Sequence, residues 1–158
     1  MKLIKSLLPI LAVLTVMPVV GAQSSDAPEF VVQTTTTGII QLSARKFENG
    51  EYRQAAGIAL QATERGLTSG RRSAAWSNLC AARAMQVQYD AAIEACETAL
   101  DARVTWQANN NYGAVLYRAG RLADSERAFA AAFEIAPDET VIAENRALVS
   151  SRTLAAAQ

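Results

Sequence analysis

Few side chains in this sequence could carry out chemistry, and the two cysteines, Cys80 and Cys96, are the most reactive of them. The chain contains no histidine, which is the commonest general base and a frequent metal ligand. Nucleophile pairs of the Ser-His and Cys-His type are therefore excluded. Two cysteines do not complete a structural zinc site, which needs four ligands, so we expect no metal and no cofactor.

Paired carboxylates are the next candidates for chemistry. Asp90 and Glu94 are four residues apart, and Glu94 and Glu97 are three apart, so each pair can share one face of a helix. Acid–base work needs a cleft that shifts their pKa values, whereas we expect these residues on an outer, solvated face. Glycine-rich phosphate loops are also absent from the sequence. The sequence therefore predicts a protein that is not an enzyme.

The first 22 residues have the order of a secretory signal peptide. Lys2 and Lys5 precede an apolar stretch over residues 6–20, and the small residues Gly21 and Ala22 come before a polar segment. The apolar stretch is shorter than the roughly 20 residues that span a bilayer. We therefore predict cleavage after Ala22, a periplasmic or secreted protein, and no stable membrane insertion of the mature chain.

Charge and composition bear on the kind of partner. The sequence has 15 basic and 15 acidic residues, and removing Lys2 and Lys5 leaves 13 against 15, a net charge of about −2. Nucleic-acid binding proteins gather basic charge on one face, so we expect no nucleic-acid partner. Lys46 is then the single lysine of the mature chain, a composition that favours a bacterial periplasmic origin.

Residues 23–36 are expected to form an extended, flexible arm before the folded domain, which we place at 37–158. Pro28 and the run of threonines at 34–37 lack a helical period and favour extended backbone. The arm is either a mobile spacer or a segment that docks on the body through residues 30–32.

A repeat of two helical stripes organises the domain. Tyr52, at the start of one stripe, recurs as Tyr89 after 37 residues and as Leu122 after a further 33. Apolar and small residues follow each of them at i+3, i+4 and i+7, which places them on one face of a helix. A period near 34 residues predicts an all-α array of stacked helix hairpins. Gly50 and Gly120 suit tight turns within hairpins, and Pro137 should end the sixth helix.

These positions resemble the tetratricopeptide (TPR) family. The motif residues fall in repeats at about 36–70, 73–105 and 106–139, followed by a capping helix over 140–157. Departures from the pattern are Val87, where glycine is usual, Ser125, where alanine is usual, and a lengthened connection over residues 66–73. The positions that carry the resemblance and are assigned structural roles, with Trp76 packing between repeats, are Tyr52, Trp76, Asn78, Tyr89, Asn111, Gly113, Gly120, Phe129 and Pro137.

The resemblance implies a right-handed superhelix with a concave groove that holds a peptide or a partner helix. It implies a protein or peptide partner and an adaptor function. The wall is nearly neutral, and Arg118 is its one basic residue among those expected to line it, so a two-cation clamp for a carboxylate is not expected. The implied groove residues are Phe47, Ser77, Ala81, Met85, Asn110, Ala114, Tyr117, Arg118 and Leu148.

Several alternatives stay open at this level. The groove holds either a partner segment or the chain's own arm or last helix. The amides at Asn78 and Asn111 bond either a partner's backbone or, as we favour, a neighbouring helix. Cys80 and Cys96 form either a disulfide, as export would favour, or two buried thiols. Besides an adaptor, the protein could be an assembly subunit that forms a permanent complex or homo-oligomer through the same surface.

Overall fold

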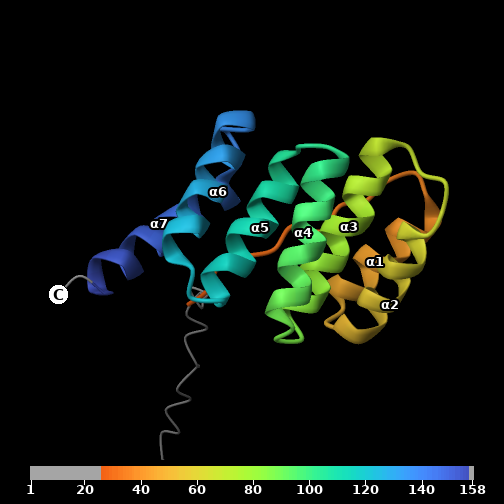
Figure 1. Cartoon of the computed structure of the whole chain (residues 1–158), viewed down its shortest axis with the longest axis horizontal. Coiled ribbons are helices and arrows are strands. Elements are labelled where there is room, and N and C mark those ends of the chain that lie inside the picture. Colours follow the sequence, from red (N-terminus) through yellow and green to blue (C-terminus); the bar gives the residue numbers. More distant parts are fainter. Residues whose placement is uncertain (1–25, 157–158) are drawn as a thin grey trace, which may run out of the picture.

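The computed structural model describes residues 26–156. The expected signal peptide, its cleavage after Ala22 and the first residues of the arm lie outside this range. Within it the protein is all-helical, with no strand, and the all-α prediction is confirmed (Figure 1). The helices are α1 (Gly38–Glu48), α2 (Tyr52–Thr63), α3 (Ser69–Ala84), α4 (Tyr89–Ala102), α5 (Trp106–Arg118), α6 (Leu122–Ile135) and α7 (Thr140–Ala156).

The helices pack in two layers. Each helix contacts its neighbours in the sequence, and the odd-numbered helices also contact one another in the order α1, α3, α5, α7. The odd-numbered helices therefore form one continuous layer, which α2, α4 and α6 cover from one side (Figure 1). Helices α3 and α5 are the most deeply buried, because each has neighbours on several sides.

Small residues allow this close packing. Alanines are buried along both layers, for example Ala75 on α3, Ala92 on α4 and Ala114 on α5, and short side chains let helix axes approach. One close approach joins α5 to α6, where the ring of Phe129 lies against Gly113. The Ser125 hydroxyl also donates to the Gly113 carbonyl across this contact, at 2.7 Å.

Helix α3 begins earlier than the repeat pattern suggested. A lengthened connection was expected over residues 66–73, but α3 starts at Ser69. The physical reason lies in the first helical turn, where Gly70 needs no intrahelical partner for its N–H and packs near the Arg103 guanidinium, so the glycine does not break the helix.

Three hairpin turns share one backbone conformation. Gly50 and Gly120 have φ of +76° and +79°, and Val87 takes the same place between α3 and α4 with φ of +63°. In each turn the following N–H donates to a carbonyl five residues earlier, as from Gln88 to Arg83 at 3.1 Å. This is the hydrogen bond of a glycine-type helix end, so Val87 adopts a conformation that favours glycine.

Replacing Val87 by glycine is expected to raise the free energy of unfolding by about 1 kcal/mol, because a left-handed conformation costs a non-glycine residue about 1–2 kcal/mol. Little burial is lost, since Val87 is 69% exposed. Val104→Gly is the matched control, because Val104 is 62% exposed and has no positive φ. Urea unfolding measures both variants. If Val87→Gly lost as much stability as Val104→Gly, the positive φ of Val87 would not cost the protein free energy.

Candidate functional site: a groove that holds an extended segment

The arm, residues 26–36, lies across the odd-numbered helices. Its backbone meets Asn145 on α7, then Asn111 on α5, then Asn78 on α3, before the chain enters α1. Figure 1 shows this orange segment passing behind the helices. The arm thus runs opposite to the order of the helix pairs. We call the surface it covers on α3, α5 and α7 the groove.

Three asparagine side chains bind the arm's backbone in the same way. Each Oδ1 accepts from the backbone N–H of one arm residue, and each Nδ2 donates to the carbonyl of that same residue. The N–H bonds are 2.8 Å from Glu29 to Asn145, 2.7 Å from Val31 to Asn111 and 2.7 Å from Gln33 to Asn78. The matching carbonyl bonds are 3.0, 2.8 and 2.9 Å. We call these three residues the asparagine ladder.

Each amide of the ladder is also bonded to the preceding odd-numbered helix. The Asn78 Nδ2 donates to Ser43 Oγ on α1 at 3.2 Å, and the Asn111 Nδ2 donates to Ser77 Oγ on α3 at 3.0 Å. The Asn145 Nδ2 donates to Asn110 Oδ1 on α5 at 2.9 Å. The amides therefore serve a neighbouring helix, as favoured from the sequence, and also hold an extended backbone.

Side chains anchor the arm between the ladder bonds. Pro28 is fully buried, and Phe30 is 7% exposed. The Phe30 and Phe47 rings make a T-shaped contact at a centroid distance of 6.5 Å, and the Arg118 guanidinium lies 5.1 Å from the Phe30 ring centroid, a cation–π contact. Arg118 also donates to the Pro28 carbonyl at 3.3 Å.

The groove residues expected from the sequence divide into three groups. Phe47, Met85 and Arg118 line the hollow around Phe30, and the Tyr117 hydroxyl donates to the Asp26 carbonyl at 3.4 Å. Asn110 donates to the Glu29 carbonyl, at 3.1 Å. The others do not bond the arm: Ser77 bonds Asn111, Ala81 and Ala114 are fully buried in the core cluster that includes Phe30, and Leu148 is half-buried on α7.

Several functional residues were missed from the sequence. Pro28, Ser43 and Asn145 were not singled out as site residues, and Asn78 and Asn111 were assigned to the packing of helices. The signal that could have found the ladder is its spacing, because Asn78, Asn111 and Asn145 are 33 and 34 residues apart. A polar side chain that recurs on the buried face of every odd-numbered helix needs a bonding partner each time.

The assigned structural positions are occupied as follows. Gly113 and Phe129 meet in the core, and Gly50 and Gly120 form turns. The aromatic residues Tyr52, Trp76 and Tyr89 are half-buried at the margin of the core. Trp76 is therefore less deeply buried than a residue packed between repeats. Pro137 is exposed just after the end of α6 at Ile135.

The two cysteines are joined in a disulfide. Cys80 on α3 and Cys96 on α4 have their Cα atoms 5.2 Å apart, and both are fully buried. Within residues 26–156 there is no free cysteine. The bond ties α4 to the helix that carries Asn78, two residues before Cys80.

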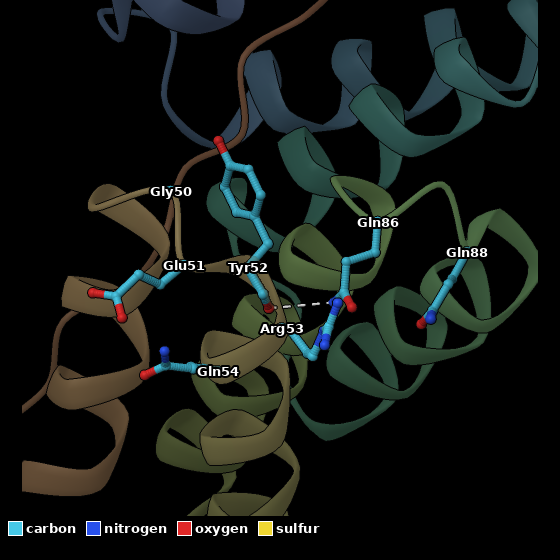
Figure 2. A pocket seen from close by; sticks show the side chains of 7 residues that line it. All are labelled: Gly50, Glu51, Tyr52, Arg53, Gln54, Gln86 and Gln88. Carbon is cyan, nitrogen blue, oxygen red and sulfur yellow. Dashed lines mark hydrogen bonds between the residues drawn. The ribbon is translucent and has the colours of Figure 1, made fainter.

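An open hollow of about 640 Å³ lies beside the start of α2 and the turn after α3 (Figure 2). Two of its polar side chains are already engaged, since the Gln86 Nε2 donates to the Tyr52 carbonyl at 3.2 Å and Glu51 pairs with Lys46 at 2.7 Å. The hydrogen bond from Lys46 lowers the pKa of Glu51. The Tyr52 side chain points out of this hollow toward the arm.

Two other residues with shifted pKa values, Tyr112 and Arg121, also lie outside the groove. Burial, and then a hydrogen bond to Glu97, raises the pKa of Tyr112. The hydrogen bond to Asp124 raises the pKa of Arg121.

Among the described residues no group of three or more His, Cys, Asp or Glu side chains is placed to hold a metal ion. No helix within that range is long and apolar enough to cross a membrane.

Compared with known proteins, the chain matches no protein-family model and no curated protein. Any family assignment therefore rests on the repeat residues of the chain itself.

Proposed function

We propose that the protein is an exported, non-catalytic adaptor of the TPR type, which holds an extended segment of a partner protein in the groove. The observation that carries the proposal is the asparagine ladder, because the only groups of the arm that it binds are backbone groups. An amide offers one acceptor and two donors, so it pairs with an extended chain much as a neighbouring strand would. The ladder thus accepts any segment that can extend through the groove.

The spacing of the ladder supports a general peptide site. One asparagine per helix pair bonds every second arm residue, at 29, 31 and 33. The step between helix pairs therefore matches the two-residue period of an extended chain. The proposal includes a right-handed superhelical stacking of TPR units, which the repeat residues and the two-layer helix packing support.

Export to the periplasm or the exterior is part of the proposal. It is supported by the signal-like residues 1–22 and by the Cys80–Cys96 disulfide, because such bonds persist in oxidising compartments.

A second candidate function is structural. Here the arm closes the groove permanently, and the protein joins a complex or a homo-oligomer through other surfaces. The observation that favours it is the burial of Pro28 and Phe30, since Phe30 belongs to the main core cluster. The two candidates differ in whether the groove ever holds a segment of another polypeptide.

Photo-crosslinking in the producing cell separates the two candidates. A photoreactive residue at Met85, which lines the hollow beside Phe30, is placed in a chain carrying Phe30→Ala to loosen the arm. We expect an adduct with another polypeptide, because a loosened arm yields the groove to a partner. Adding Asn111→Ala should reduce this adduct severalfold, since the ladder then lacks its middle member.

Asn109→Ala is the matched control for Asn111→Ala. Asn109 is also a buried asparagine on α5, but its amide bonds the Thr105 carbonyl of its own helix turn, at 3.2 Å. This control should leave the adduct unchanged. Absence of any adduct heavier than the chain, or equal yields from both asparagine variants, would overturn the adaptor proposal and favour the structural candidate.

A further inference from the structure

We infer that the groove selects, from another protein, an extended segment with a proline two residues before an aromatic residue and a β-branched residue two after it, together with an acceptor for the Arg118 Nε that the arm does not supply. The chain's own arm is the built-in competitor of this segment. The inference rests on the proposed function and specifies its partner.

The first step is the alternation of the arm. Its odd-numbered residues 29, 31 and 33 give their backbone groups to the ladder. Its even-numbered residues turn their side chains to the protein: Pro28 is fully buried, Phe30 is nearly so, and Val32 packs on the same core cluster. The Glu29 side chain is exposed. Pro28 and Phe30 therefore carry most of the sequence preference, and position 29 tolerates many side chains, whereas Val31 and Gln33 are half-buried like Val32.

The second step is that the arm fits the groove incompletely. Hollows of about 380 and 420 Å³ remain beside Phe30 and Phe47. The Arg118 Nε is buried and has no hydrogen-bond partner among the described residues, and none of the ion pairs found there includes Arg118. A buried donor without an acceptor is unfavourable. A segment that fills the hollows and brings an acceptor to Arg118 would therefore bind better than the arm.

The third step excludes a second copy as the preferred occupant. An arm exchanged between two copies makes the same contacts as an arm bound within one chain, and it also loses the freedom of two separate molecules. The bound arm leads into α1 through residues 34–37, so its effective concentration is on the order of millimolar for so short a link. Only a segment with additional contacts overcomes this competition.

The test uses the full chain and a fluorescent peptide with the sequence of residues 26–35, followed by fluorescence anisotropy. The chain with Phe30→Ala should bind the peptide at least about tenfold more tightly than the unmodified chain, because its arm no longer competes well. A peptide with alanine in place of Phe30 should lose at least about tenfold in affinity. A peptide with alanine in place of Glu29 should change by less than about threefold, as exposed side chains contribute little.

Circular dichroism checks that each chain is folded, and Val32→Ala provides a second way to loosen the arm. If the peptide binds neither loosened chain, the inference is overturned. It is also overturned if the three peptides bind equally. A dimer at assay concentration that the peptide dissociates would identify a second copy as the occupant and would also overturn it. If crosslinks from Met85 persist while the peptide fails, the adaptor function stands and only the stated pattern is wrong. If the peptide binds as expected while no adduct forms in the cell, the pattern stands and the adaptor function fails.

Discussion

Replacing Phe129 by alanine is expected to lower the free energy of unfolding by about 3–5 kcal/mol, the usual range for a phenylalanine removed from a core. Phe129 has no exposed surface, and its ring fills the space that Gly113 leaves open on α5. A Cβ built on Gly113 would lie 2.9 Å from three ring carbons, so the two positions are complementary in shape. Chemical denaturation followed by circular dichroism measures the loss.

Phe133→Ala is the matched control on the same helix. Phe133 is half-buried, with the Arg146 guanidinium 4.6 Å from its ring centroid, so its removal should lower stability by less than half as much. Gly113→Ala should also destabilise, by about 1–3 kcal/mol through overpacking. In the double variant the two losses should not add, because the smaller side chain at 129 makes room for the new methyl group. Equal losses from Phe129→Ala and Phe133→Ala would contradict the packing of α5 on α6.

The helices themselves could be predicted from the sequence because their determinants are local. Tyr52, Tyr89 and Leu122 each begin an apolar stripe, and these are the residues at which α2, α4 and α6 start. Gly50 and Gly120 mark the turns because the backbone there has a positive φ, which glycine adopts most easily. The start of α3 could not be placed, since a glycine in a first turn looks the same in sequence as a glycine in a loop.

The site could be predicted only in part. The candidate groove lining was identified because side-chain faces follow helical periodicity, and Phe47, Met85, Tyr117 and Arg118 all lie beside the arm. The occupant was left open, because the bonds that hold it join residues 45 to 116 positions apart. An asparagine amide can bond a helix or an extended chain equally well. Spacing alone does not tell which, and here each amide does both.

Recognition through backbone groups explains why the groove residues are mostly small or neutral. Ala81 and Ala114 are fully buried in the core cluster that includes Phe30. The short side chains of Asn78 and Asn111 reach the arm's backbone from the same two helices. On the proposed function, affinity comes from repeated amide bonds, and selectivity comes from the buried contacts at Pro28 and Phe30.

The second large effect should come from removing the disulfide. The variant with both Cys80→Ala and Cys96→Ala is expected to lose about 3 kcal/mol of unfolding free energy, the value for a closed loop of about 15 residues. The bridge spans 16 positions. In a domain of this size such a loss should lower the melting temperature by about 10 °C. Thermal unfolding with and without a thiol reductant measures it.

The double variant provides its own control, because reductant should destabilise the unmodified chain and leave the variant unchanged. Thiol titration of the unmodified protein, isolated without reductant and then denatured, should find no free thiols. Two free thiols, or an unchanged melting temperature in the variant, would contradict the presence of the disulfide.

Asn78 lies on α3 near Cys80, so the same variant tests whether the disulfide orients the ladder. Helix α3 is packed against α1, α2, α4 and α5, so its position is fixed by many contacts. We therefore expect the disulfide to stabilise the fold without setting the ladder's position. The folded variant should still bind the peptide of residues 26–35 more tightly than the peptide with alanine in place of Phe30.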